Sequence, residues 1–95
     1  MLIETTYKIG DTVSFKLTSG EELVARLEKE DETTYNIAKP MVLVAGEKGL
    51  GLAPFMFSVS TDGKFVLNQS SVACVAKTAK ELADQYMTQT TGIQL

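Results

Sequence analysis

The chain has 95 residues, of which 44% are hydrophobic and 22% charged, and its formal net charge at pH 7 is −3. This length and composition predict one globular domain over residues 1–95 and argue against a disordered chain. Histidine is absent, which removes the commonest general base and metal ligand, so we expect no enzyme active site, no metal and no cofactor. The negative charge argues against broad binding to duplex DNA but leaves a local nucleic-acid site open.

The first element in chain order is a β-hairpin over residues 13–27. Hydrophobic and polar residues alternate in 11–17 and again in 22–28, the period of two that is typical of a strand with one buried face. Turn-forming residues lie between the two runs, and Gly20 can adopt a positive φ there. The alternation places Leu23, Ala25 and Leu27 on the buried face and Val24 on the opposite face.

Further β-rich segments follow the hairpin. In residues 35–45, Pro40 requires an edge position, a bulge or a sharp bend. The glycine-rich residues 46–51 are expected to form a flexible loop, and residues 52–60 a further strand. A tight turn, a short strand, a polar turn and a final strand are then expected at 61–64, 65–67, 68–71 and 72–76.

The last expected element is a helix over about residues 78–91. Thr78 and Glu81 have the spacing of a capping box, in which each side chain hydrogen-bonds to the other residue's backbone N–H. An apolar stripe follows at helical spacing, and Gly92 is a plausible stop. The stripe consists of Ala79, Leu82, Ala83 and Tyr86.

The single cysteine and the N-terminal residues indicate the compartment. Cys74 lies in an apolar run and cannot form an internal disulfide, so we expect a small buried side chain in a cytoplasmic protein. Residues 1–4 lack a basic region followed by a long apolar run, and no stretch has the length of a membrane span.

Short strands joined by tight turns predict a small, strongly bent β-barrel of the Sm-like, SH3-like or OB type. The first hairpin resembles the first motif of the Sm and LSm family, which has alternating apolar residues, a turn glycine, a small residue before a leucine, and then an aspartate and an asparagine. The positions that carry this resemblance are Val13, Phe15, Leu17, Gly20, Ala25, Leu27, Asp31 and Asn36. It implies a mainly β, five-stranded Sm-like (SH3-type) barrel over about residues 11–76, followed by the C-terminal helix.

The chain departs from the family in several places. Asn36 lies one residue later than the family's asparagine, which requires an insertion in that loop. In the second motif, whose family pattern is Ile-Arg-Gly-x-x-Val, Asn68 replaces the arginine and Gln69 the glycine. Sm proteins also usually have their helix before the first strand. The whole chain nevertheless resembles small Sm-like proteins of cyanophage origin, which would place it in the cytoplasm of a host cell.

The resemblance implies a homo-oligomeric ring. Sm-like proteins close into rings by pairing the edge strand of one barrel with that of the next, which satisfies otherwise unpaired backbone groups. Residues 55–60 and 72–76 are the expected edges, since both are apolar and have few charges that would prevent pairing. The alternative is that a monomeric barrel buries both segments against its own helix.

The resemblance also implies single-stranded RNA or DNA as the partner at the inner rim of the ring. Asn36 would recognise a base edge and Tyr35 would stack on a base, next to Asp31. Asn68 and Gln69 would add hydrogen bonds but cannot neutralise phosphate. Lys39 and Lys64, which lie nearby in the sequence, are the candidates to offset the missing arginine.

Each of these residues also has a purely structural interpretation. Tyr35 can be a core aromatic residue of its strand, Asn36 a turn residue bonded to its own backbone, and Asn68 with Gln69 a polar turn. The competing hypothesis for the whole chain is therefore a structural or protein-interaction ring, such as a phage accessory protein, that binds no nucleic acid.

Overall fold

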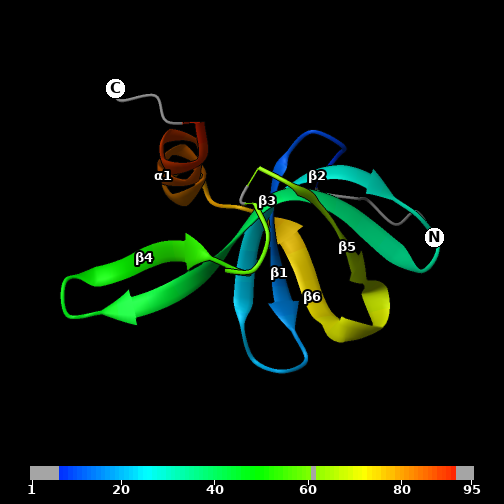
Figure 1. Cartoon of the computed structure of the whole chain (residues 1–95), viewed down its shortest axis with the longest axis horizontal. Coiled ribbons are helices and arrows are strands. Elements are labelled where there is room, and N and C mark those ends of the chain that lie inside the picture. Colours follow the sequence, from blue (N-terminus) through cyan, green and yellow to red (C-terminus); the bar gives the residue numbers. More distant parts are fainter. Residues whose placement is uncertain (1–6, 61, 92–95) are drawn as a thin grey trace.

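The computed structural model describes residues 7–60 and 62–91, and in this part the chain forms six antiparallel strands and one α-helix (Figure 1). A short 3-10 helix, Gln69–Ser71, separates the last two strands. The strands are β1 Thr12–Leu17, β2 Glu22–Glu30, β3 Thr34–Gly46, β4 Gly49–Pro54, β5 Lys64–Asn68 and β6 Val72–Lys77, and the helix is α1 Lys80–Thr91. The expected mainly β class with a C-terminal helix is confirmed.

The first hairpin has the predicted strands and turn. β1 and β2 pair antiparallel with Val13 opposite Ala25 and Phe15 opposite Leu23, and Gly20 in the turn has a φ of 111°. The predicted inward-facing residues are all buried in the main core, because alternation places them on the concave side of the sheet. This core consists of Val13, Phe15, Leu17, Leu23, Ala25, Leu27, Tyr35 and Ile37.

β3 bends at Lys39 and Pro40, so the prediction that Pro40 would interrupt this strand is confirmed. Residues 34–38 pair with β5, whereas residues 41–46 pair with β4. At the bend the register with β2 shifts, and Lys39 has a φ of 50°, a value that non-glycine residues rarely adopt. β3 therefore pairs with β5 before the bend and with β4 after it.

The strand order is β4-β3-β2-β1-β6, with β5 paired to β3 beside this path. In the described part of the chain no pairing joins the two ends, so the sheet is open where a closed barrel was expected. Six strands are present, whereas the resemblance implied five.

Two predictions for residues 46–60 are wrong. The expected flexible loop over residues 46–51 is a two-residue hairpin turn followed by the start of β4, with Gly49 at a φ of 111°. The expected strand over residues 52–60 ends at Pro54, which lacks a backbone N–H, so residues 55–60 are not an edge strand. The side chain of Phe57 in this loop is 86% exposed.

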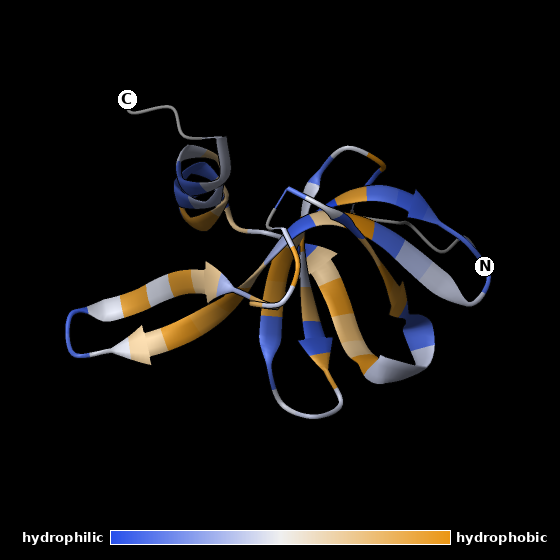
Figure 2. Cartoon of the chain, viewed as in Figure 1, coloured by the Kyte–Doolittle hydropathy of each residue, from blue (hydrophilic) through white to orange (hydrophobic). Residues whose placement is uncertain are grey.

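α1 covers the opposite side of the sheet and creates a second, smaller core there. Tyr86 packs on Val24, Met41 and Leu52, and its side chain is 1% exposed. Val24 is thus buried although the alternation placed it opposite the main core, because the helix covers that face. Hydrophobic residues consequently lie on both faces of the central strands, and Figure 2 shows hydrophobic positions along these strands.

The start of the helix differs from the predicted capping box. α1 begins at Lys80, and the Thr78 hydroxyl hydrogen-bonds to the Ser14 hydroxyl at 2.8 Å. The Thr78 backbone N–H donates to the Thr12 carbonyl, so this residue ties the end of β6 to β1. The expected stop at Gly92 and the first turn residue, Thr61, lie outside the described residues.

Cys74 is exposed, so the expectation of a buried thiol is wrong. It lies opposite Lys16 in the pairing of β6 with β1. Lys16 is exposed on the face opposite the main core, and Cys74 shares that face because directly opposed residues in a sheet point to the same side. α1 does not extend over this part of the face.

Candidate functional site

The five residues that the sequence placed at a nucleic-acid site lie at one end of the molecule. Asp31 is in the turn between β2 and β3, and Gln69 begins the 3-10 helix after β5. The Gln69 Nε2 donates to the Asp31 carbonyl at 2.5 Å and to the Thr34 carbonyl at 3.4 Å. In the pairing of β3 with β5, Asn68 lies opposite Thr34. The turn after β2 and the turn after β5 are therefore connected by the Gln69 side chain.

Asn36 and Asp31 contact each other directly. The Asn36 Nδ2 donates to the Asp31 Oδ2 at 3.4 Å, and the Thr34 hydroxyl donates to the same oxygen at 3.4 Å. The Lys29 ammonium lies 3.6 Å from the other carboxylate oxygen of Asp31. The Asp31 carboxylate thus organises the loop and orients the Asn36 amide.

Tyr35 is a core residue. Its side chain is 7% exposed, and its ring packs on Phe15 with centroids 5.1 Å apart at an interplanar angle of 60°. Burial raises the pKa of the Tyr35 phenol, and the nearby carboxylate of Glu30 adds to that rise. The ring offers no free face to a base, so the structural interpretation of this residue holds.

The candidate site has more acidic than basic side chains. The exposed Glu30 and Glu32 flank Asp31 in the chain, and Lys29 is paired with Asp31. The other cations near these strands have partners of their own: Arg26 and Lys64 both pair with Glu28, at 3.4 and 3.7 Å. The site can offer amide and carboxylate groups to a base edge, whereas phosphate neutralisation would require one of these ion pairs to open.

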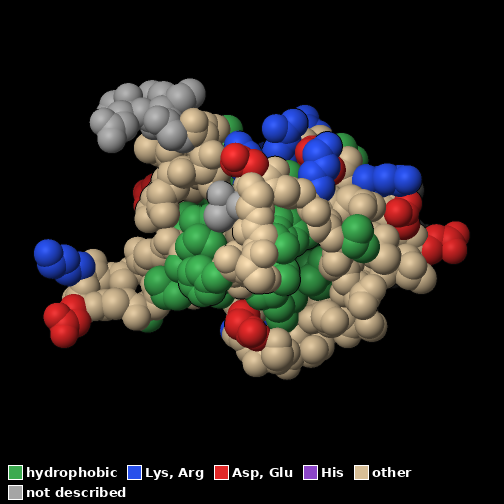
Figure 3. All heavy atoms as spheres, viewed as in Figure 1, with side chains coloured by type: hydrophobic (Ala, Val, Ile, Leu, Met, Phe, Trp, Pro, Cys, Tyr) green, Lys and Arg blue, Asp and Glu red, His purple; other side chains and the backbone are tan. Residues whose placement is uncertain are grey.

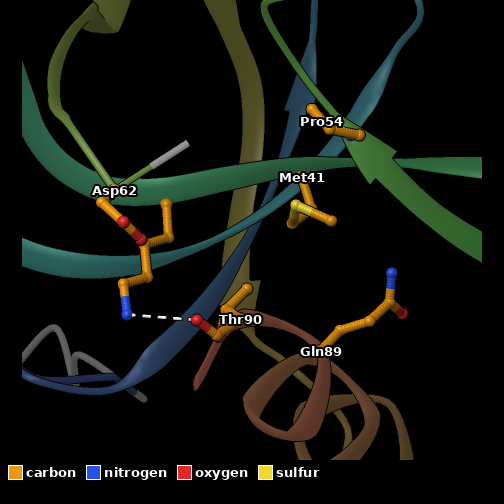
Figure 4. Close-up of a pocket in the computed structure, with 6 residues that line it drawn as sticks. Met41, Pro54, Asp62, Gln89 and Thr90 are labelled. Atoms are coloured by element: carbon orange, nitrogen blue, oxygen red, sulfur yellow. Dashed lines mark hydrogen bonds between the residues drawn. The ribbon is translucent and has the colours of Figure 1, made fainter. Parts of the chain in front are cut away.

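A second feature, which the sequence did not indicate, is a groove between α1 and the bend of β3 (Figure 4). It has a volume of about 240 Å³, and Lys39, Met41, Pro54, Asp62, Gln89 and Thr90 line it. The Lys39 ammonium donates to the Thr90 carbonyl at 3.2 Å, in the last turn of the helix. Lys39 also has a positive φ, and no local pattern in the sequence indicates this conformation or the contact with the helix.

Three strands have an open edge within the described residues, since β4, β5 and β6 each pair on one side only. Exposed hydrophobic side chains lie on or beside two of them: Val66 of β5 is 66% exposed and Leu50 of β4 is 62% exposed. Hydrophobic side chains also gather on the face shown in Figure 3, with acidic and basic residues mostly at its margins.

In residues 7–60 and 62–91, no group of three or more Cys, Asp or Glu side chains is arranged to hold a metal ion. None of the helices in this part of the chain has both the length and the hydrophobicity that a membrane crossing requires.

Comparison with protein-family models and with curated proteins finds no match to this chain.

Proposed function

We propose that this protein is a subunit of an Sm-like homo-oligomeric ring, in which β6 of one copy adds to the open edge of β5 in the next. The observation that carries the proposal is the pair of open, hydrophobic edges at β5 and β6. Each strand is five or six residues long, and their central residues carry no charge. A heterologous contact of this kind satisfies two edges per interface and generates a ring when its rotation closes.

The arrangement of the strands supports the Sm-like part of the proposal. The chain returns through β6 to the outer side of β1, and β3 bends so that one strand contributes to both halves of the sheet. Closure of the barrel would then be completed between subunits rather than within one chain.

We further propose that the inner rim of the ring binds single-stranded RNA or DNA through Asn36, Asp31, Asn68 and Gln69. The connection between the turns after β2 and β5 favours this, because the resemblance places nucleic-acid contacts on these two turns. Tyr35 is excluded from base stacking by its burial, so hydrogen bonds alone would recognise the base. We therefore expect weak, salt-sensitive binding.

The acidic residues at the rim favour the alternative, a structural or protein-interaction ring without nucleic acid. Fluorescence anisotropy with short oligo-U and oligo-A at low salt separates the two. We expect Asn36→Ala to weaken binding about fivefold, for the loss of about 1 kcal/mol of hydrogen bonding. Gln85→Ala on the exposed side of α1 is the control. Absent binding, or binding unchanged by Asn36→Ala, would favour the alternative.

Light scattering tests the ring itself. We expect a multiple of the subunit mass for the native chain and a lower mass for Val66→Lys, because a charge on β5 opposes strand addition. Met87→Lys is the matched control, since Met87 is also exposed but lies on α1. A native protein that is monomeric at micromolar concentration would exclude the ring.

A further inference from the structure

The open edge of β4 differs from those of β5 and β6. A two-residue turn joins β3 to β4, so Gly46 and Gly49 form the hydrogen-bonded pair that closes it. Such pairs recur at every second residue, which makes Val44–Gly51 and Val42–Ala53 the next two. The intervening residues of β4, namely Leu50, Leu52 and Pro54, therefore direct their backbone groups away from β3 and toward the open edge.

Two of these three residues lack a free N–H or C=O group for pairing with another strand. The Leu52 carbonyl accepts a hydrogen bond from the Gln89 Nε2 of α1 at 3.1 Å. Pro54 has no backbone N–H to donate. A residue that joins an antiparallel ladder exchanges both an N–H and a C=O bond with its partner. Leu50 alone keeps both groups available.

The helix itself also occupies the space beside this edge. Gln89 and Thr90 line the same groove as Pro54 and Met41, and Figure 4 shows Gln89 and Pro54 facing it from α1 and β4. The helix is fixed there by the Tyr86 hydroxyl, which donates to the Ala38 and Lys39 carbonyls at 3.1 and 2.8 Å. The Lys39–Thr90 hydrogen bond holds its last turn.

We propose that α1 blocks the addition of another strand at the open edge of β4, and that Gln89 is the residue responsible. We call this arrangement the guard. A ring of the proposed kind uses two edges of each subunit, β5 and β6, and leaves β4 as a third. An open third edge would let subunits branch into larger aggregates. The inference rests on the proposed ring for the roles of β5 and β6, but its prediction about β4 is independent of them.

Gln89→Ala tests the guard by freeing the Leu52 carbonyl. We expect light scattering to show species of higher mass than the native assembly, increasing with protein concentration. Gln89→Asn should behave in the same way, because its shorter side chain keeps the amide but does not reach Leu52. Gln85→Ala, a matched exposed glutamine of the same helix, should leave the mass unchanged. Circular dichroism melting of each variant establishes that it is folded.

A double variant identifies the edge that is used. If the higher-mass species form through β4, adding Leu50→Lys to Gln89→Ala should restore the native mass, whereas Leu50→Lys alone should have no effect. Native mass for both Gln89 variants would overturn the guard. Higher mass that persists in the double variant would also overturn it. A monomeric native chain would refute the ring but not the guard, which still predicts association of Gln89→Ala.

Discussion

Tyr86 is the residue that joins the helix to the sheet. Its ring is part of the second core between α1 and the sheet, and its single hydroxyl proton is shared between two carbonyls at the bend of β3. These carbonyls lie at Ala38 and Lys39, where the change of strand partner interrupts the ladder. The Tyr86 hydroxyl therefore provides a hydrogen-bond donor at the bend, where the strand pairing is interrupted.

Removing this hydroxyl should destabilise the protein without unfolding it. We expect Tyr86→Phe to lower the free energy of unfolding by about 1–3 kcal/mol, the cost of leaving buried carbonyls without a donor. Urea denaturation of the variant and the native chain measures the difference. Equal midpoints would mean that water replaces the hydroxyl.

Tyr86 also makes stability depend on pH in the alkaline range. Burial raises the pKa of its phenol from 10.0 to about 12. In the unfolded chain the phenol loses its proton near its ordinary pKa, so the contribution of Tyr86 is complete below about pH 10 and is lost as the pH rises toward 12. Urea midpoints at about pH 9 and about pH 11 should therefore differ more for the native chain than for Tyr86→Phe. A residual decline is expected in the variant, because burial also raises the pKa of Tyr7 and Tyr35.

Lys39 has a strained backbone, and its side chain forms a hydrogen bond to the last turn of the helix. Its φ of 50° costs an L-residue about 1 kcal/mol or more, whereas glycine adopts it freely. Both Lys39→Gly and Lys39→Ala lose the hydrogen bond to Thr90, but only the glycine relieves the strain. We expect Lys39→Gly to be the more stable of the two by about 1 kcal/mol in thermal or urea denaturation. The opposite order would show that the bend relaxes in the variants.

At the scale of elements, the turns after β2 and β5 are held together by one side chain. Gln69 bonds the carbonyls of Asp31 and Thr34, and the Gln69 backbone N–H donates to Thr33 at 2.9 Å. Gln69→Ala should therefore loosen the loop that carries Asn36. We expect faster amide hydrogen exchange at residues 31–34, with no change in the hairpin of β1 and β2. Unchanged exchange at residues 31–34 would mean that the backbone bond alone holds the turns.

The sequence proposes residues for the candidate site but does not give its geometry. Asp31, Asn36 and Gln69 are named by spacing within the two motifs. The hydrogen bonds between them depend on the pairing of β3 with β5, which joins segments far apart in the chain. The same pairing places Tyr35 in the core beside Phe15. Position in a motif therefore does not decide whether an aromatic ring is exposed.

Residues 46–60 show where patterns along the chain fail. Apolar residues and glycines in this segment fit a loop, a strand or a hairpin equally well, because periodicity does not indicate a partner. β4 forms there since the second half of β3 requires a neighbour after the bend, and Pro54 ends it. Long-range pairing thus overrides the local preference.

At the scale of the whole molecule, the proposed ring has a thermodynamic consequence. Subunits that share strand edges stabilise one another by mass action, so the melting temperature should rise with protein concentration. Calorimetry across about a hundredfold dilution measures this. Val66→Lys should show no such dependence, because its assembly is impaired. A native melting temperature that is independent of concentration would contradict the proposed assembly.

The sequence by itself determined the first hairpin, the bend at Pro40, the class of the fold and the presence of a C-terminal helix. These features depend on contacts between residues close in the chain and on backbone preferences. Both can be recognised from hydrophobic alternation and from the positions of proline and glycine. Only the tertiary structure decided that the sheet is open, that Cys74 is exposed and Val24 buried, and that Gln89 reaches β4. The burial of Val24, the exposure of Cys74 and the contact of Gln89 depend on which face and edge the helix covers, whereas the open sheet depends on which strands pair. Both result from packing between segments far apart in the chain, which no local pattern encodes.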